Sequence, residues 1–182
     1  MFSPDATTPT PKNLISTFVS DKNDYANLCK PKTDAYFSKA SGKFHVCDKG
    51  LAYTTKAEDN SCDKLGGFVS TAMESTTGVL IHEFHHSDQV GDKVTNSVGH
   101  IRDITYGPSN CMRLRNGGDN QLAFVNADSY MWFALNAYYN NKCGKKYGDP
   151  IVTTEDFEDG TQQAEESNEY DATLASGIFA GV

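Results

Sequence analysis

The chain has 182 residues, of which 38% are hydrophobic, so it fits a single folded domain and not an intrinsically disordered chain. No apolar run approaches the roughly 20 residues that cross a bilayer, and we therefore expect no membrane partner. The formal net charge of -8 argues against nucleic acid as a partner.

The first dozen residues are rich in Thr and Pro and predict an exposed lead-in. This stretch lacks a basic start followed by a long apolar run, so no signal peptide is visible in it. Apolar residues then recur at helical spacing, which predicts a short helix running toward Tyr25. These residues are Leu14, Ile15, Phe18 and Val19.

Residues 43–47 and 51–55 have the composition of two β-strands. The Asp48-Lys49-Gly50 sequence between them favours a turn, so we expect a β-hairpin here. Cys47 and Cys62 flank the second strand, and their proximity in sequence makes them candidates for a disulfide bond.

Five cysteines are spread along the chain, and no two form a C-x-x-C pair, which argues against a cysteine zinc site or a redox motif. Their distribution is typical of a secreted disulfide framework with one thiol left over. The alternative is a cytosolic protein with five buried thiols. The cysteines are Cys29, Cys47, Cys62, Cys111 and Cys143.

A helix is predicted over residues 79–89, with Thr76 or Thr77 as its N-cap. It carries the sequence H-E-x-x-H from His82 to His86. Residues four apart lie on the same face of a helix, so both imidazoles can reach one metal ion. The Glu beside the first ligand, Glu83, can accept a proton from a water molecule at the metal without itself binding the metal.

Residues 90–120 are rich in Gly, Asn, Asp and Ser, which predicts irregular structure that must supply the third ligand. A glutamate on a later helix is excluded in practice as the third metal ligand, because no Glu occurs between Glu83 and Glu155. By residue type and position, the remaining candidates are Asp92, His100 and Asp103.

The apolar stripe of residues 125–141 predicts a second helix that ends before Gly144. From Asp149 to the last residue there are nine acidic residues and no Lys or Arg. We therefore divide the chain into a main folded domain, residues 1–148, and an acidic tail, residues 149–182. A solvated terminus is the simplest interpretation of that tail.

Two further motifs carry a resemblance to a known family. The segment from Asp103 to Gly107 matches D-x-x-Y-G, and residues 125–134 match N-A-D-x-Y followed by F-A. Together with H-E-x-x-H, these ordered matches over residues 79–134 resemble the deuterolysin, or aspzincin, family of zinc endopeptidases. The resemblance implies an α+β, zincin-like fold, with a small N-terminal sheet or hairpin, an active-site helix and a mainly helical C-terminal half.

The resemblance also implies roles for particular residues. One Zn²⁺ per chain is held by His82, His86 and Asp103. Glu83 is the general base that acts on metal-activated water, and Tyr106 stabilises the oxyanion. Asp128 is a candidate hydrogen-bond partner of a ligand histidine, although a position in the first turn of its helix explains it equally well.

Some members of this family cleave before lysine with the help of an acidic residue, for which Asp119 is the candidate here. A surface turn is the simpler interpretation of Asp119. We expect a secreted, extracellular monomer that hydrolyses peptide bonds in protein or peptide substrates. The alternatives are a secreted zinc-binding or antigen protein of the same fold without proteolytic activity, and a structural domain with incidental histidines.

Overall fold

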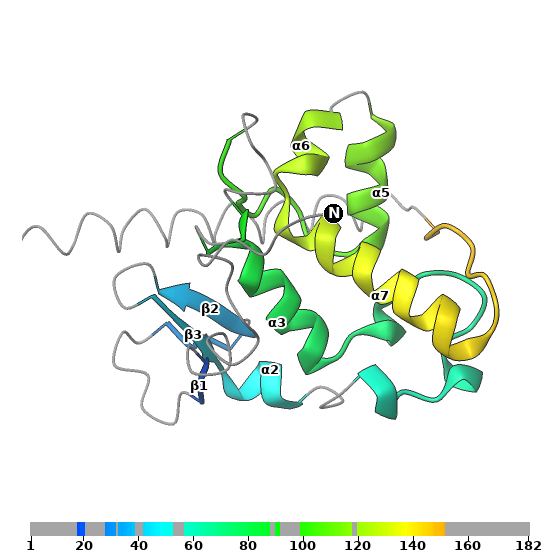
Figure 1. Ribbon diagram of the computed structural model, residues 1–182, viewed down its shortest axis with the longest axis horizontal. Coiled ribbons are helices and arrows are strands. Elements are labelled where there is room, and N and C mark those ends of the chain that lie inside the picture. Colours follow the sequence, from blue (N-terminus) through cyan, green and yellow to red (C-terminus); the bar gives the residue numbers. More distant parts are fainter. Residues whose placement is uncertain are drawn as a thin grey trace, which may run out of the picture.

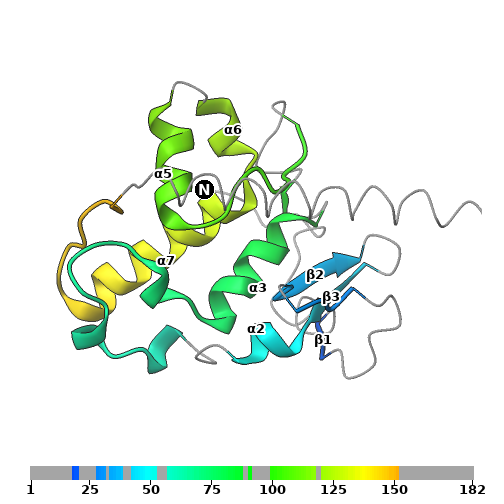
Figure 2. The same cartoon turned by 180° about the vertical axis from the view of Figure 1, so that it is seen from behind.

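The computed structural model describes residues 18–20, 28–31, 33–38, 42–52, 57–87, 90–91, 99–117 and 120–151. The fold is mixed α/β, as predicted, with a small sheet and a larger helical part. Helix α3, Thr76–His85, lies between the sheet on one side and helices α5 and α7 on the other (Figure 1). The view from behind shows the same order (Figure 2). The expected lead-in and most of the acidic tail lie outside the described residues.

Three short strands form the sheet in the order β1-β3-β2, with β1 parallel and β2 antiparallel to β3. The strand predicted from residue 43 is confirmed as β3. A helix through Phe18 is wrong, because this residue pairs with Phe44 in the sheet and long-range pairing overrides local helical spacing. The strands are β1 Phe18–Ser20, β2 Ala35–Ser38 and β3 Lys43–Val46.

The predicted hairpin after β3 is also wrong, because the chain turns there into helix α2, Asp48–Ala52. The antiparallel partner of β3 is instead β2, which precedes it. Gly50 is required in this helix, because α2 packs so closely against Asp34 that a side chain at position 50 would clash with the Asp34 carbonyl. The remainder of the expected second strand, residues 53–55, lies outside the described residues.

Helix α3 begins earlier and ends earlier than predicted. Its N-cap is Ser75, whose hydroxyl accepts a hydrogen bond from the Gly78 amide at 3.2 Å. Thr76, one of the two expected caps, instead donates its hydroxyl to the Gly50 carbonyl at 2.8 Å. The helix ends at His85 instead of residue 89, so His86 lies at the C-cap.

The long C-terminal helix α7, Ala127–Cys143, confirms the second helix prediction, including its end at Gly144 in a left-handed conformation. Gly78 lets α3 approach α7 closely, since a Cβ there would lie 3.1 Å from Leu135 Cδ1. None of the described helices is long and apolar enough to cross a membrane. The core around this contact contains Leu65, Val69, Met73, Cys111, Met131, Trp132, Leu135, Tyr139 and Tyr147.

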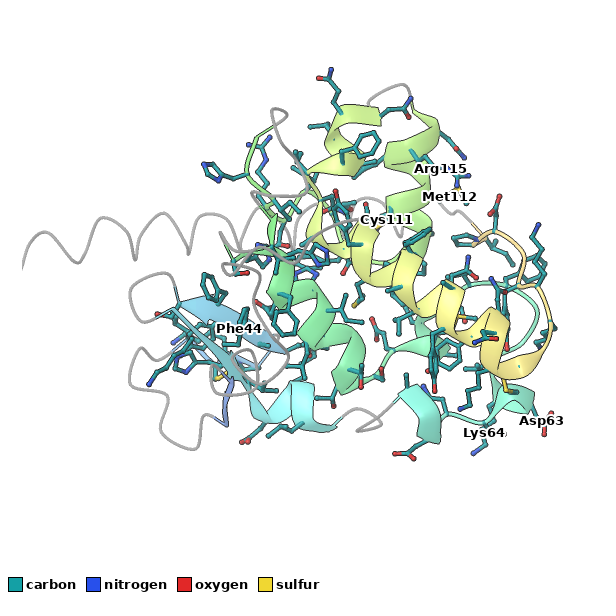
Figure 3. The ribbon with its side chains drawn as sticks, viewed as in Figure 1. Phe44, Asp63, Lys64, Cys111, Met112 and Arg115 are labelled. Atoms are coloured by element: carbon teal, nitrogen blue, oxygen red, sulfur yellow. A yellow bond between two sulfur atoms is a disulfide. The ribbon has the colours of Figure 1, made fainter. Side chains whose placement is uncertain are left out.

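Part of the segment expected to be irregular forms helix α5, Pro108–Asn116, and a short helix, α6, Asn120–Phe124, follows it. Gly107 precedes α5 with a positive φ of 87°, and Pro108 occupies the first turn, where its missing amide costs nothing. On the sheet side, Phe44 points from β3 toward α3 (Figure 3) and packs 4.9 Å from the Phe84 ring. One face of α3 therefore packs on the sheet, and the other packs on α7.

Two disulfide bonds link Cys29 to Cys47 and Cys62 to Cys143, so the Cys47–Cys62 bridge considered from the sequence is wrong. Cys111 is a buried free thiol. The Cys62–Cys143 bond joins the segment before α3 to the end of α7, across the helical core. Sequence proximity failed here because helix packing brings the two ends together.

Removing the Cys62–Cys143 bond by double replacement with Ser should lower the free energy of unfolding by about 4 kcal/mol, because the bond closes a separation of 81 residues. Removing Cys29–Cys47, with a separation of 18, should cost about 3 kcal/mol and serves as the matched comparison. Urea unfolding followed by circular dichroism measures both. Equal or reversed losses would contradict this expectation.

Candidate metal centre

Three side chains that are distant in sequence place one donor atom each around a common point. His82 Nε2 lies 3.0 Å and His86 Nε2 lies 3.3 Å from Asp103 Oδ1, and the two Nε2 atoms lie 3.2 Å apart. His82 and Asp103 are buried, with exposed fractions of 6% and 5%. The three residues form the one group with metal-ligand chemistry found among the described residues.

The two histidines reach this point because they lie one turn apart at the C-terminal end of α3. Asp103 lies on a loop that is hydrogen-bonded to the start of α7. The Asn126 Oδ1 atom accepts hydrogen bonds from the amides of Ile104 at 2.9 Å and Thr105 at 3.2 Å. Arg102 also pairs with the backbone of residues 125 and 127. Asn126 therefore fixes the Asp103 loop, a role that its place in the sequence does not reveal.

Asp128 connects the histidine, the loop and the helical core. Its Oδ1 atom accepts a hydrogen bond from His82 Nδ1 at 3.0 Å. Its Oδ2 atom accepts from the Gly107 amide at 2.7 Å and from Trp132 Nε1 at 2.7 Å. A carboxylate in this position orients the ring of a metal-binding histidine and selects its tautomer.

Cys111 lies beside the same carboxylate, between α5 and α7 (Figure 3). Its thiol lies 3.9 Å from Asp128 Oδ2, a long contact in which the sulfur donates. Burial and the nearby Asp128 charge raise the pKa of the Cys111 thiol well above its ordinary value. The thiol therefore stays protonated and belongs to the packing around Asp128 instead of acting as a nucleophile.

The charges of the three side chains are mutually stabilising. Burial lowers the pKa of His82, but Asp103 and Asp128 outweigh it and hold this pKa well above its ordinary value. Burial raises the pKa of Asp103, but His86 and His82 outweigh it and hold this pKa well below its usual range. The carboxylate is thus ionised, and its field favours a cation at the point between the rings.

The donor set fits zinc. Because His82 Nδ1 donates to the Asp128 carboxylate, Nε2 is the ring atom that faces His86 and Asp103 and is available to a metal ion that displaces its proton. Two atoms bound to a tetrahedral zinc at about 2.0–2.1 Å lie about 3.3 Å apart. The separations of 3.0–3.3 Å are close to that value, so the three residues could hold the ion.

Glu83 and Tyr106 flank this point. Glu83 is buried, with an exposed fraction of 6%, and its charge contributes to raising the pKa values of both His82 and His86. The Tyr106 ring stacks on the His82 ring, with 5.6 Å between centroids. Both residues therefore lie near the two histidines.

The other sequence candidates do not join the group. His85 turns away from it, because its Nδ1 atom lies 2.7 Å from the Ile81 carbonyl and its ring stacks on Tyr130. His100 is exposed and is not a member of the donor group. Asp92 and Asp119 lie outside the described residues, so their roles stay predictions.

Comparison with known proteins points the same way. Residues 7–135 match the model of the aspzincin family, which is described as lysine-specific metallo-endopeptidase. The match covers all three donor residues and both flanking candidates. No curated protein matches the chain.

Proposed function

The chain belongs to the aspzincin family of metallo-endopeptidases, and on that premise we propose that it is a zinc-dependent endopeptidase. The observation that carries the proposal is the convergence of His82 Nε2, His86 Nε2 and Asp103 Oδ1 within 3.0–3.3 Å of one another. These residues are the proposed zinc ligands. Zinc held there would lower the pKa of a water molecule toward neutral and polarise a substrate carbonyl.

Glu83 is the proposed general base. It accepts a proton from the attacking water and returns it to the leaving amine. Its burial supports this role, because a carboxylate shielded from bulk water interacts more strongly with a proton at the reacting atom. Glu83 follows His82 directly on α3, so the helix that delivers the ligand also delivers the base.

Tyr106 is the proposed oxyanion donor, and its hydroxyl would stabilise the charge that develops on the substrate carbonyl oxygen. Asp128 contacts both the ligand His82 and the backbone next to Tyr106. It binds His82 through one oxygen and the Gly107 amide through the other, so one carboxylate positions a ligand and the backbone after Tyr106. We assign Asp128 a positioning role for this reason.

We further propose that the protein acts outside the cell, as a monomer, on protein or peptide substrates. The two disulfide bonds support this location, because such bonds persist in oxidising compartments. The lysine specificity named in the family description supports an acidic residue near the scissile bond. Asp119 was the sequence candidate for that residue.

Metal removal tests the proposal. We expect one zinc per purified chain by atomic absorption, loss of casein hydrolysis after treatment with 1,10-phenanthroline, and recovery when one equivalent of zinc is restored. Far-ultraviolet circular dichroism of the treated protein controls for unfolding. One bound zinc without hydrolysis would indicate a zinc-binding protein of the same fold instead. Failure to retain zinc at all would indicate a structural or interaction domain.

A further inference from the structure

The indole of Trp132 is hydrogen-bonded to the carboxylate that holds a candidate zinc ligand. Trp132 is the single tryptophan of the chain and is buried, with an exposed fraction of 4%. Its Nε1 atom donates to Asp128 Oδ2 at 2.7 Å, and Asp128 Oδ1 accepts from His82 Nδ1 at 3.0 Å. Two hydrogen bonds therefore connect the indole to His82. Trp132 is not one of the motif positions that carry the family resemblance.

The position of Trp132 on α7 produces this contact. Asp128 and Trp132 are four residues apart, so their side chains lie on the same face of the helix, one turn from each other. The indole ring belongs to the core cluster that also contains Leu135 and Tyr139. The core therefore fixes the ring, and the helix sets the distance between its N–H group and Asp128.

The choice of acceptor goes beyond what Trp132 itself requires. A buried indole N–H group requires an acceptor, and a backbone carbonyl would meet that requirement. Trp132 instead donates to a carboxylate oxygen, which also accepts from the Gly107 amide at 2.7 Å. An indole N–H and a backbone amide can only donate, so this oxygen is an acceptor in both bonds. Hydrogen bonds of this kind to a carboxylate are the stronger ones in proteins.

Without the indole donor, the orientation of the carboxylate would be less well defined. Asp128 is only 2% exposed, so it takes its hydrogen bonds from the protein and not from bulk water. Among the described residues, Oδ2 would keep the Gly107 amide and the long contact of 3.9 Å with the Cys111 thiol. The carboxylate could then turn about its last torsion angle, and Oδ1 would no longer be directed at His82.

We propose that Trp132 is a positioning residue of the metal centre. Its indole N–H group holds the Asp128 carboxylate in the orientation in which Oδ1 binds His82 and Oδ2 binds the Gly107 amide. The first bond orients the ring of a zinc ligand, and the second fixes the backbone beside Tyr106. The inference rests on the proposed zinc peptidase function, and Trp132 acts only through Asp128.

Zinc affinity tests the first part of this role. Trp132→Phe keeps an aromatic ring and removes the donor. We expect it to bind zinc about tenfold more weakly than the wild type, at the lower end of the 10–100-fold loss for groups that orient metal ligands. Replacing Trp132 by benzothienylalanine, in which sulfur stands in place of the ring nitrogen, removes the donor with little change of shape and should give the same loss. Competition with a chromogenic chelator measures zinc affinity without any substrate.

Tyr139→Phe is the matched control. Tyr139 is fully buried on the same helix, and its hydroxyl donates to the Met73 carbonyl at 3.2 Å and accepts from Asn60 Nδ2 at 2.8 Å. This variant removes buried hydrogen bonds from α7 but none at Asp128. It should lower stability in urea unfolding and keep the zinc affinity of the wild type. If Trp132→Phe and Tyr139→Phe have equal zinc affinity, the inference is overturned.

Cobalt(II) in place of zinc gives a spectroscopic test, because its visible absorption depends on the arrangement of its ligands. The absorption bands should shift in Trp132→Phe and in the benzothienylalanine variant, measured at saturating cobalt, but not in Tyr139→Phe. A role limited to packing would leave the bands of the benzothienylalanine variant where they are in the wild type. Bands that coincide in all four proteins would contradict the positioning of His82 through Asp128.

Kinetics at saturating zinc test the second part of the role. Tyr106, as the proposed oxyanion donor, acts in the transition state, so its displacement lowers kcat and leaves KM unchanged. We expect kcat of Trp132→Phe to fall about tenfold with KM within a fewfold of the wild type. An unchanged kcat would overturn the link through Gly107.

The outcomes separate this inference from the proposed function. A wild type that cleaves peptides, with Trp132→Phe equal to it in zinc affinity and in kcat, would refute only the role of Trp132. A wild type that binds one zinc and cleaves nothing would refute the peptidase function, and the affinity comparison would still decide the positioning of His82. A wild type that binds no zinc would overturn both.

Discussion

Replacing Glu83 by Gln is expected to lower kcat/KM for casein-derived peptides by about 10³-fold or more, because general acid–base catalysis contributes about 10²–10⁴-fold. Glutamine keeps the size of the side chain but cannot accept the proton. Zinc content should stay at one per chain, since Glu83 is not a proposed ligand. Steady-state kinetics and atomic absorption on the same preparation measure both quantities.

A matched control comes from the same motif. His85 lies two residues after Glu83, but its ring packs on Tyr130, away from the donor group. His85→Gln should therefore keep kcat/KM within a fewfold of the wild type. If Glu83→Gln retained most of the activity, the assignment of the general base would be wrong, even if zinc were bound as proposed.

Replacing Asp103 by Asn should lower zinc affinity by more than about 100-fold, because the loss of groups that only orient ligands already costs about 10–100-fold. The amide lacks the negative charge that the two imidazoles stabilise in the wild type. Dialysis against chelators of graded affinity, followed by atomic absorption, measures zinc retention. Activity should fall in parallel with zinc content.

Asp92→Asn is the decisive comparison, because residue type and position alone leave Asp92 as a second candidate for the third ligand. We expect this variant to retain zinc and activity. Circular dichroism checks that both variants are folded. Zinc loss in Asp92→Asn with retention in Asp103→Asn would reverse the ligand assignment and remove the main support for the proposed mechanism.

Local periodicity accounts for the parts of the fold that were predicted correctly. The spacing of His82 and His86 by one helical turn follows from the geometry of any α-helix, so the sequence could place both rings on one face. The end of α7 at Gly144 follows from the left-handed conformation that glycine tolerates. Each of these features depends on residues close together in the chain.

The errors occur where distant contacts override local preference. Phe18 has helical spacing with its neighbours but pairs with Phe44 in the sheet. The segment after β3 forms α2 and not a strand, and within it Gly50 packs on the backbone of the distant Asp34. Cys62 bonds to Cys143, not to the nearer Cys47, because helix packing joins the two ends.

The sequence by itself determined the helix that carries two histidines and a glutamate, the family resemblance and the absence of a long apolar span, since each is encoded in residue types at short separations. Only the tertiary structure brought Asp103 close to both rings, because hydrogen bonds to Asn126 fix the loop that carries it. Only the tertiary structure, likewise, linked His82 to Gly107, through hydrogen bonds of both residues to Asp128. Burial and charge at such points depend on these long-range contacts, which no local pattern encodes.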